Sequence, residues 1–256
     1  MTINSDGKVK VVGTYDETYD FTNWKNVKSV TVGFYNAACI TEIGEVIVTG
    51  INDSVACATS DWKNVCMVAI TPNITFGVTE DGEVLHTKPL SNYRVPQLLL
   101  AEVQNWKDLQ FIGASGACVA GIDFYGNVKA VSPLYPEIAR NVRGWKRIQY
   151  LSVATDAIAG INMDGEVLIA LNSKAKPVKA SVLSALKGAK KVCIDKAFVA
   201  GLMPDDSLKV IWFGDAQHYQ DSILALDNEQ DIADIYSYDG YLVVLKKDGT
   251  ILAPEQ

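Results

Sequence analysis

Few residues in this sequence have the types and spacing that enzymes use for chemistry. Only two histidines occur, His86 and His218, so a mechanism that needs a cluster of imidazoles is excluded by their number. The cysteines include no CxxC pair, and most fall in apolar, strand-like runs, where a reduced cysteine packs as a small hydrophobic residue. They are Cys39, Cys57, Cys66, Cys118 and Cys193. We expect a reducing compartment and no structural zinc, and neither histidine is marked as the partner of a nucleophilic cysteine.

Carboxylates are abundant, but the sequence singles out no catalytic or metal-binding set. Asp81, Asp164 and Asp248 each precede a glycine in a hairpin-like turn, whereas a calcium site needs about six or more converging oxygens. No pair of acids is marked for glycoside hydrolysis, and no phosphate-binding glycine loop, HExxH or GxSxG motif occurs. We therefore predict a protein that is not an enzyme and has no cofactor and no metal.

Composition narrows the class of partner. Lys and Arg number 23 against 30 Asp and Glu, a formal charge of −7, which argues against a surface that binds nucleic acid by releasing counterions. No apolar run approaches the roughly 20 residues of a membrane helix, and the residues after Met1 lack the features of a signal peptide. We expect no nucleic-acid partner and no membrane partner. The predicted location is cytoplasmic, or in a particle that is assembled without a signal peptide.

The strongest signal is an internal repeat. Four of the five tryptophans begin matching segments, at spacings of 38, 44 and 39 residues. Counting 20 residues forward from each of them reaches a turn glycine every time. The tryptophans are Trp24, Trp62, Trp106 and Trp145, and the glycines are Gly44, Gly82, Gly126 and Gly165. Self-similarity at a fixed period indicates repeated supersecondary units.

Three further segments are degenerate copies of this unit. One starts at Leu186 and has the turn P-D-D-S, in which Ser207 stands in place of the glycine. Another starts at Glu229 and keeps its Asp-Gly turn. Residues 1–23 contain an Asp-Gly turn and a strand-like run, so they read as a unit whose beginning is missing. Six unit starts and seven turns are therefore visible.

Each unit reads as a set of short β-strands. A first run with alternating apolar residues is followed by a short loop, a second run of small and apolar residues, the glycine turn and a third run. The interval before the next unit holds most of the prolines and is predicted to contain a fourth, outer strand. Units of three or four strands repeated about every 40 residues are typical of the blades of a β-propeller.

The same residues carry a family resemblance. A hydrophobic strand, a short loop, a small or apolar strand and then D-G-E-V, with a further glycine six residues after the turn glycine as in Gly44 and Gly50, resembles the regulator of chromosome condensation repeat. The W-K-N-V start is similar to bacterial versions of that repeat. The histidine and the Gly-Gln pair usual in the family are absent here. WD-repeat and kelch propellers share the period but not these markers, and they are the alternatives.

We therefore predict an all-β fold, with a single β-propeller domain over residues 1–256 and units that start near residues 24, 62, 106, 145, 186 and 229. The chain length divided by the unit length gives six blades, and the seventh turn leaves seven blades as the alternative. The N-terminal segment, with a strand at 8–13, is expected to lie beside the final unit and close the ring, because an open ring leaves unpaired sheet edges. Deleting residues 1–13 should then lower the thermal stability.

Two sets of residues are candidates for binding. The tryptophans could stack on a ligand, but their constant distance from a core strand favours packing between blades. The loops between first and second strands differ in chemistry from unit to unit, and such loops gather on one face of a repeat protein. Their aromatic residues are typical of protein interfaces, or they merely plug the end of the ring. The predicted partner-binding face comprises Phe34, Tyr35, Asn36, Asn73, Ile74, Asp156, Lys196, Phe198, Tyr238 and Tyr241.

These observations favour a non-catalytic protein-binding propeller, either an adaptor or an inhibitor-like interaction module, whose partner is another protein. The resemblance implies a family with nucleotide-exchange activators, bacterial protein inhibitors of enzymes and adaptors, but this sequence matches the repeat and no specialised contact loop. Two alternatives stay open. One is a structural or glycan-recognising component of a larger particle such as a phage or tailocin, and the other is an enzyme that uses the central channel.

Overall fold

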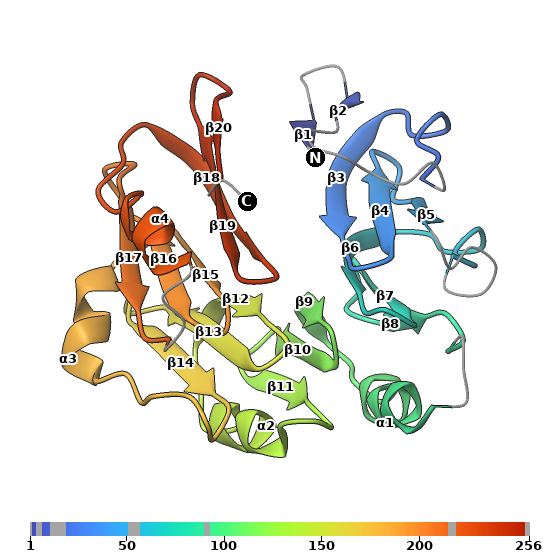
Figure 1. The fold of residues 1–256 in the computed structure, drawn as a ribbon. Coiled ribbons are helices and arrows are strands. Elements are labelled where there is room, and N and C mark those ends of the chain that lie inside the picture. The colour runs from blue at the N-terminus through green and yellow to red at the C-terminus, as the bar shows by residue number, and fades with distance from the viewer. Residues whose placement is uncertain are drawn as a thin grey trace. The chain divides into compact units, whose positions relative to one another are not determined.

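The computed structural model describes residues 2–3, 7–10, 19–50, 57–89, 93–214 and 219–253. The chain is all-β in its main elements and contains six three-stranded antiparallel sheets, which confirms the predicted set of six blades (Figure 1). We call each sheet a blade and number the blades along the chain. Blade 1 contains β3 (Val27–Val32), β4 (Asn36–Thr41) and β5 (Val46–Gly50). Blade 2 contains β6 (Val65–Ile70), β7 (Thr75–Thr79) and β8 (Val84–His86). Blade 3 contains β9 (Leu109–Ser115), β10 (Cys118–Asp123) and β11 (Val128–Val131). Blade 4 contains β12 (Ile148–Val153), β13 (Ala157–Asn162) and β14 (Val167–Leu171). Blade 5 contains β15 (Lys191–Ile194), β16 (Phe198–Leu202) and β17 (Leu208–Trp212). Blade 6 contains β18 (Ile232–Tyr238), β19 (Tyr241–Lys246) and β20 (Ile251–Leu252).

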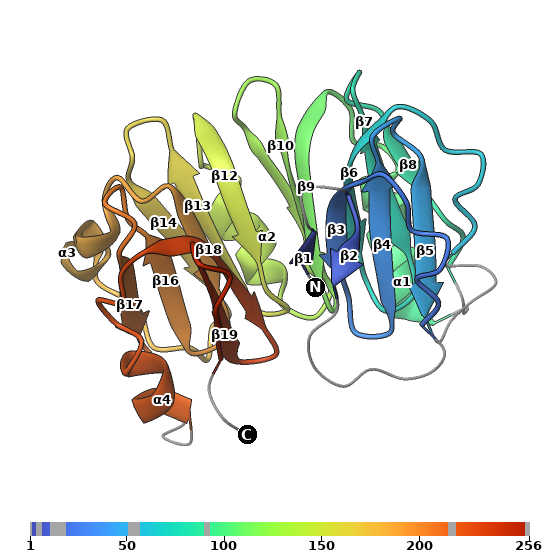
Figure 2. The same cartoon turned by 90° about the horizontal axis from the view of Figure 1, so that it is seen from above.

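The chain divides into two compact units, residues 1–124 and 125–256, which we call unit 1 and unit 2. Within a blade the three strands run side by side, as β3, β4 and β5 do in Figure 2. The loop between the first and second strands lies at one end of the blade, which we call the loop end. The hairpin between the second and third strands lies at the other end, the turn end.

The second strand of each blade is the most deeply buried element. Every residue of β4, β7, β10, β13 and β16 is buried, because neighbouring packing covers both faces of the strand. A strand covered on both sides needs small side chains where a large one packs against it. At Gly77, for example, an added Cβ would lie 2.8 Å from the ring of Trp62. Trp62 also packs against Ala38 and Ile40 of blade 1, so this tryptophan is a packing residue between two blades.

A repeated backbone contact explains the offset of 20 residues. The carbonyls of four turn glycines each accept a hydrogen bond from the first strand of the next blade, as in Gly44 with the Val65 N–H at 3.1 Å. Gly44 has φ +74°, and an added Cβ would lie 3.0 Å from Cα of Asn64. Glycine is therefore needed both for the left-handed conformation and for the close approach. The same bond joins Gly7 to Val27, Gly82 to Leu109 and Gly126 to Ile148.

Blade 5 forms this turn without glycine, and the assignment of Ser207 to the glycine position is wrong. Asp206 takes the left-handed conformation, with φ +64°, and its carbonyl accepts the Ile232 N–H at 2.9 Å. Its own N–H donates to the Met203 carbonyl, as the N–H of Gly44 donates to Thr41. The turn contains no extra residue. Asp206 can take the place of the glycine because Asp tolerates the left-handed region better than most side chains do.

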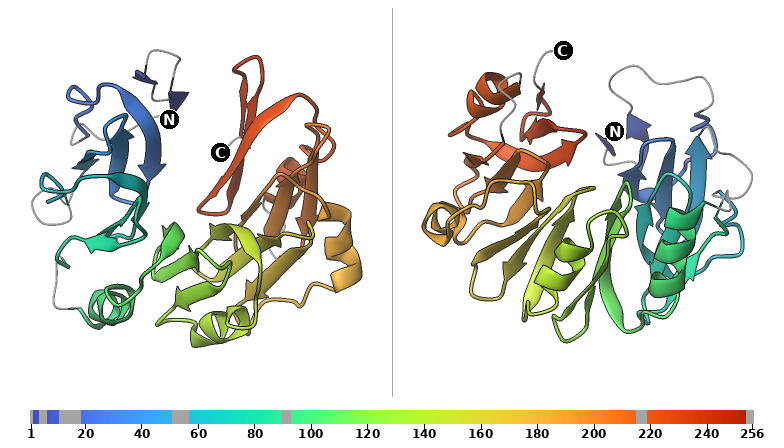
Figure 3. Two further views of the ribbon diagram at one scale, coloured as in Figure 1. Left: turned by 180° about the vertical axis from the view of Figure 1, so that it is seen from behind. Right: turned by 60° about the horizontal axis from the view of Figure 1, so that its bottom comes forward.

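The four intervals from blade 2 to blade 6 contain helices, so the predicted fourth strand is wrong for these intervals. They hold α1 (Arg94–Val103), α2 (Pro136–Val142), α3 (Ala180–Leu183) and α4 (Gln220–Leu224), which Figure 3 shows outside the sheets of their own units. In α1 the buried residues Pro96, Leu99 and Val103 recur at helical spacing, and α2 has proline in its first turn. Helix-forming Leu, Ala and Glu outweigh the signal that we took from the prolines. None of the helices in the described ranges is long and apolar enough to cross a membrane.

The described part of the N-terminal segment contains two short strands. The strands β1 (Thr2–Ile3) and β2 (Val9–Lys10) pair antiparallel, and the intervening Gly7 makes the repeated bond to blade 1. The interpretation of residues 1–23 as an incomplete unit stays a prediction. The predicted ring closure involves residues 11–13, which lie outside the described residues, and it stays a prediction, as does the single domain.

Candidate protein-binding surface at the loop end

In unit 1 the loops between the first and second strands, at 33–35, 71–74 and 116–117, include exposed aromatic side chains and contain no charged residue. Residues 33–35 join the first two strands of blade 1, and Phe34 and Tyr35 are 38% and 47% exposed. Val32, at the end of β3, is also exposed. Exposed aromatic residues on a short loop held by two strands are the kind of anchor that protein interfaces use. Blade 1 therefore carries the main candidate contact of this unit.

Three of the predicted face residues are not on the surface. Asn36, Ile74 and Phe198 are each fully buried, because Asn36 and Phe198 begin second strands, Ile74 directly precedes one, and these strands are covered on both faces. Phe198 stacks on Trp212 with the rings 6.5 Å apart and 12° from parallel. Their inclusion in an exposed face is wrong, since the sequence does not show where the loop ends and the buried strand begins.

The loop of blade 2 is tied down by its own threonine. The hydroxyl of Thr71 donates to the Ile74 carbonyl and accepts the Ile74 N–H, both at 3.0 Å. Such side-chain bonds close a tight turn. Asn73 lies in this turn and is half-buried. It contributes only the edge of its side chain to the loop end of unit 1.

In unit 2 the loop end is charged. Lys196 is exposed in the loop of blade 5, and its Nζ lies 3.8 Å from Oδ1 of Asp239 in the turn of blade 6. Asp195 lies between them: its carboxylate accepts the N–H of Lys196 at 2.7 Å and also that of Gly240. The structure thus brings Lys196 against the loop that carries Tyr238 and Tyr241. Asp195 was missed by sequence reasoning, and its signal was an acid at the end of an otherwise apolar strand.

Burial sets the electrostatics of these acids. Burial raises the pKa of Asp195. Hydrogen bonds from the backbone of Gly240 and Lys196 lower that pKa, but by less. Burial also raises the pKa of Asp156 in the loop of blade 4, and the charge of Asp195 raises it further. Asn172 donates a side-chain hydrogen bond to the Asp156 carboxylate at 2.9 Å. The loop end of unit 2 therefore concentrates negative charge at a cost in solvation.

The loop of blade 6 is a two-residue hairpin turn. Tyr238 and Tyr241 face each other across Asp239 and Gly240, which have φ +46° and +88° as an Asp-Gly turn of this kind requires. Tyr238 is exposed, whereas Tyr241 is half-buried and donates a hydrogen bond to the hydroxyl of Tyr219 at 3.0 Å. Tyr238 is thus the aromatic contact that this loop offers.

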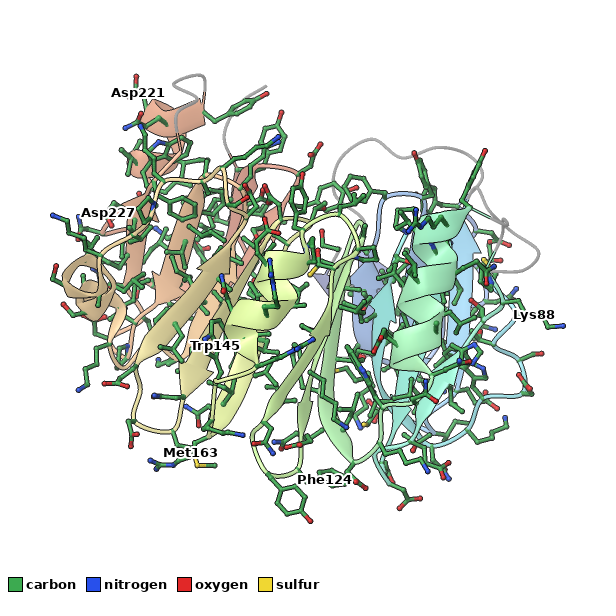
Figure 4. All side chains as sticks on the ribbon, turned by 90° about the horizontal axis from the view of Figure 1, so that it is seen from below. Lys88, Phe124, Trp145, Met163, Asp221 and Asp227 are labelled. Carbon is green, nitrogen blue, oxygen red and sulfur yellow. The ribbon has the colours of Figure 1, made fainter. Side chains whose placement is uncertain are left out.

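The turn end presents a second set of exposed apolar residues, which the sequence reasoning did not select. They stand just before the turn glycines, where a solvated turn residue is expected, and comprise Ile43, Phe124, Tyr125 and Met163. In Figure 4 the side chains of Phe124 and Met163 extend away from their blades. A cavity of about 540 Å³ in blade 1 and one of about 460 Å³ in blade 2 also lie here, lined by equivalent residues such as Lys25 with Glu45 and Lys63 with Glu83.

The described residues offer little for covalent or metal chemistry. Burial raises the pKa of Cys39 to about 11 and that of Cys193 to about 12, so both thiols are protonated at neutral pH and unsuited to nucleophilic attack. Within the described ranges, no three His, Cys, Asp or Glu side chains converge as metal ligands would. His218 lies outside those ranges, and His86 is half-buried with its Nδ1 3.1 Å from the Thr87 carbonyl oxygen.

Comparison with known proteins identifies the fold and no family. No protein-family description matches the chain, and no curated protein matches its sequence. Among solved structures, the chain is similar to the CRINKLY WD40 ectodomain of the Arabidopsis thaliana receptor kinase ACR4, with a TM-score of 0.59 and 12% identity over 89% of this chain and 78% of that one. It is also similar to the ectodomain of the Physcomitrella patens receptor kinase CR4 (TM-score 0.62, 11% identity, 89% and 60% covered) and to Prp20p of Saccharomyces cerevisiae (0.60, 14%, 91% and 72%). The fold is a six-bladed β-propeller.

Proposed function

We propose that this chain is a non-catalytic interaction module that binds another protein through the loop end of its blades. The observation that carries the proposal is the contrast between constant blades and variable loops. The second strands of blades 1 to 5 are buried throughout, whereas the loops present Phe34 and Tyr35 in one blade, Lys196 in another and Tyr238 in a third. Side chains that vary on a fixed scaffold are suited to recognition.

Two further points support a protein partner. Prp20p is described as binding Gsp1p and histones, so a fold like this one serves protein recognition in at least one case. The W-K-N-V starts and D-G-E-V turns still resemble the regulator of chromosome condensation repeat, and we propose that the blades are repeats of that type. No disulfide joins the described cysteines, which fits a reducing compartment such as the cytoplasm.

The test compares the two ends of the blades. A partner is first identified by cross-linking and mass spectrometry in the native host. A variant with Tyr35→Ala, Tyr238→Ala and Tyr241→Ala should then weaken its affinity at least tenfold, because truncating an anchor typically costs more than about 1 kcal/mol. The matched control is Tyr125→Ala with Met163→Ala, two exposed residues of the turn end.

Each outcome decides between the ends. Loss of affinity in the control variant alone assigns binding to the turn end and contradicts the proposal. Unchanged affinity in both variants contradicts it too. Binding of the chain to immobilised glycans, with no protein cross-linked, would instead support a glycan-recognising component.

A further inference from the structure

Asn36 has a fully buried side-chain amide whose hydrogen bonds are not made. Its residue is 0% exposed, and among the described residues neither Nδ2 nor Oδ1 has a hydrogen-bond partner. A buried polar group without a partner costs free energy, and such groups are rare in native proteins. The amide has two N–H donors and one carbonyl acceptor, and none of them is satisfied by the described residues.

The other blades show that the fold does not need this amide. The carbonyl of Asn36 accepts the Gly33 N–H at 2.8 Å, and the same bond is made by Ile74 in blade 2, Ala157 in blade 4 and Phe198 in blade 5. These equivalent residues are apolar and buried. An apolar residue at position 36 would thus be compatible with the blade. Asn36 in blade 1 differs in this from its equivalents in blades 2, 4 and 5.

The amide lies at the junction of blades 1 and 2, below an exposed aromatic loop. Side chains alternate along a strand, so Asn36 shares the face of Ala38 and Ile40, which pack against blade 2. Gly50 faces it on β5, where an added Cβ would lie 2.6 Å from Oδ1 of Asn36. Phe34 and Tyr35 stand directly before it in the chain and are exposed.

We infer that Asn36 is a hydrogen-bonding point for an amide group of a partner polypeptide that docks on Phe34 and Tyr35. An amide pairs with a main-chain peptide group or with an Asn or Gln side chain, because each offers a donor and an acceptor at matching spacing. Residues 33–35 have to move aside for the partner to reach Nδ2 and Oδ1. This inference rests on the proposed function and names the chemistry of the contact in blade 1.

The experiment uses the full chain and a phage-displayed library of random 12-residue peptides as the probe. Peptides selected on the wild type are measured against Asn36→Leu, which keeps a side chain branched at Cγ and removes the amide. At least one selected peptide should bind the variant at least tenfold more weakly, while the melting temperature of the variant stays unchanged or rises. The control is Asn23→Leu, an exposed asparagine near the other end of β3, which should change neither quantity.

A second variant guards against a failure of the first to fold. Asn36→Ala places in blade 1 the residue that blade 4 has at this position, and it should show the same loss of binding. In a selected peptide, replacing Asn or Gln by Leu, or a peptide bond by an ester, tells whether the partner's amide is a side chain or the main chain.

Three results would overturn the inference. One is a lower melting temperature in Asn36→Leu with unchanged peptide affinity, since the amide would then be satisfied internally, for example by water. Another is a set of peptides that lose affinity in Tyr35→Ala but not in Asn36→Leu, in which case the proposed function stands and only this inference fails. The third is the absence of any selected peptide.

Discussion

The two units of the chain stabilise the starts of their blades in different ways. In unit 1 every blade begins with a tryptophan, and Trp24, Trp62 and Trp106 are at most 8% exposed. In unit 2 only blade 4 begins with a tryptophan, and Leu186 and Glu229 take its place in blades 5 and 6. Glu229 accepts a hydrogen bond from Lys246 at 3.0 Å. The first position of a blade can therefore be occupied either by an apolar side chain or by a member of an ion pair.

Charge replaces apolar packing elsewhere in unit 2 as well. Lys190 and Lys247 both pair with Asp206 in the glycine-free turn, and Lys191 pairs with Asp234 at 2.6 Å between blades 5 and 6. At the loop end, unit 1 presents aromatic residues and unit 2 presents acids. Apolar burial is little affected by salt or pH, whereas ion pairs near the surface are sensitive to both. The two units should thus differ in how mutation and solvent destabilise them.

The largest expected effect is on the apolar wedge of unit 1. Trp62→Ala should lower the free energy of unfolding by about 3 to 5 kcal/mol, since it opens a cavity between two blades. Urea unfolding followed by far-UV circular dichroism measures this, and hydrogen exchange should locate the loss in residues 57–86. The control is Glu229→Ala at the equivalent position of unit 2, which should have a much smaller effect. Equal losses in the two variants would break the comparison.

The next effect distinguishes the turns. Gly44→Asp should cost about 2 kcal/mol or more, because the left-handed conformation is strained for a side chain and the Cβ would press on Asn64. Its control is Gly249→Asp in unit 2, where φ is +87° but no atom lies within 4 Å of an added Cβ. That variant should carry only the conformational cost, about 1 kcal/mol. Urea midpoints of the two variants give the difference, and a larger shift for Gly249→Asp would contradict the account of the turn contact.

The repeat made the fold predictable from the sequence. Which residues at the loop end are buried could not be predicted in this way. Tryptophans and glycines at one offset revealed four units and so led to the degenerate copies, because the turn glycine and the next blade touch through the backbone, which constrains the residue type. The sequence did not show that Asn36 and Phe198 are buried, since loop and strand residues adjoin without a change in composition. Nor did it show that Asp206 replaces the glycine, because an acid in the left-handed region has no marker of its own. Helices between blades were missed since prolines were read as marks of edge strands.

A smaller effect should separate the units at acid pH. Hydrogen bonds from Lys190 and Lys247 lower the pKa of Asp206 to about 2 from an ordinary value of 3.8. The stability from these pairs is present above pH 3.8 and is lost as the pH falls through about 2. Hydrogen exchange across this range should show unit 2 losing protection near residues 190, 206 and 247. In Lys190→Gln with Lys247→Gln that pH-dependent part should vanish, and 1 M NaCl should mimic it in the wild type. An unaltered pH profile in the double variant would show that the pairs do not stabilise unit 2.

The smallest expected effect tests whether the acidic loop end of unit 2 is kept at the expense of stability. Burial, with the charge of Asp195 adding to it, raises the pKa of Asp156, so the folded chain holds this proton more readily than the unfolded chain does. Stability should therefore fall as the pH rises from 3.8 through the raised pKa, and Asp156→Asn should remove that slope and raise the melting temperature slightly at pH 7. The control is Asp164→Asn, which removes one negative charge from an exposed acid of the same blade that pairs with Arg147. A residue whose removal stabilises the fold is retained for another reason, and binding is the reason that its place near the exposed Lys196 supports. If Asp156→Asn proves destabilising, the loop acids of unit 2 are structural, and recognition rests on the aromatic loop of unit 1.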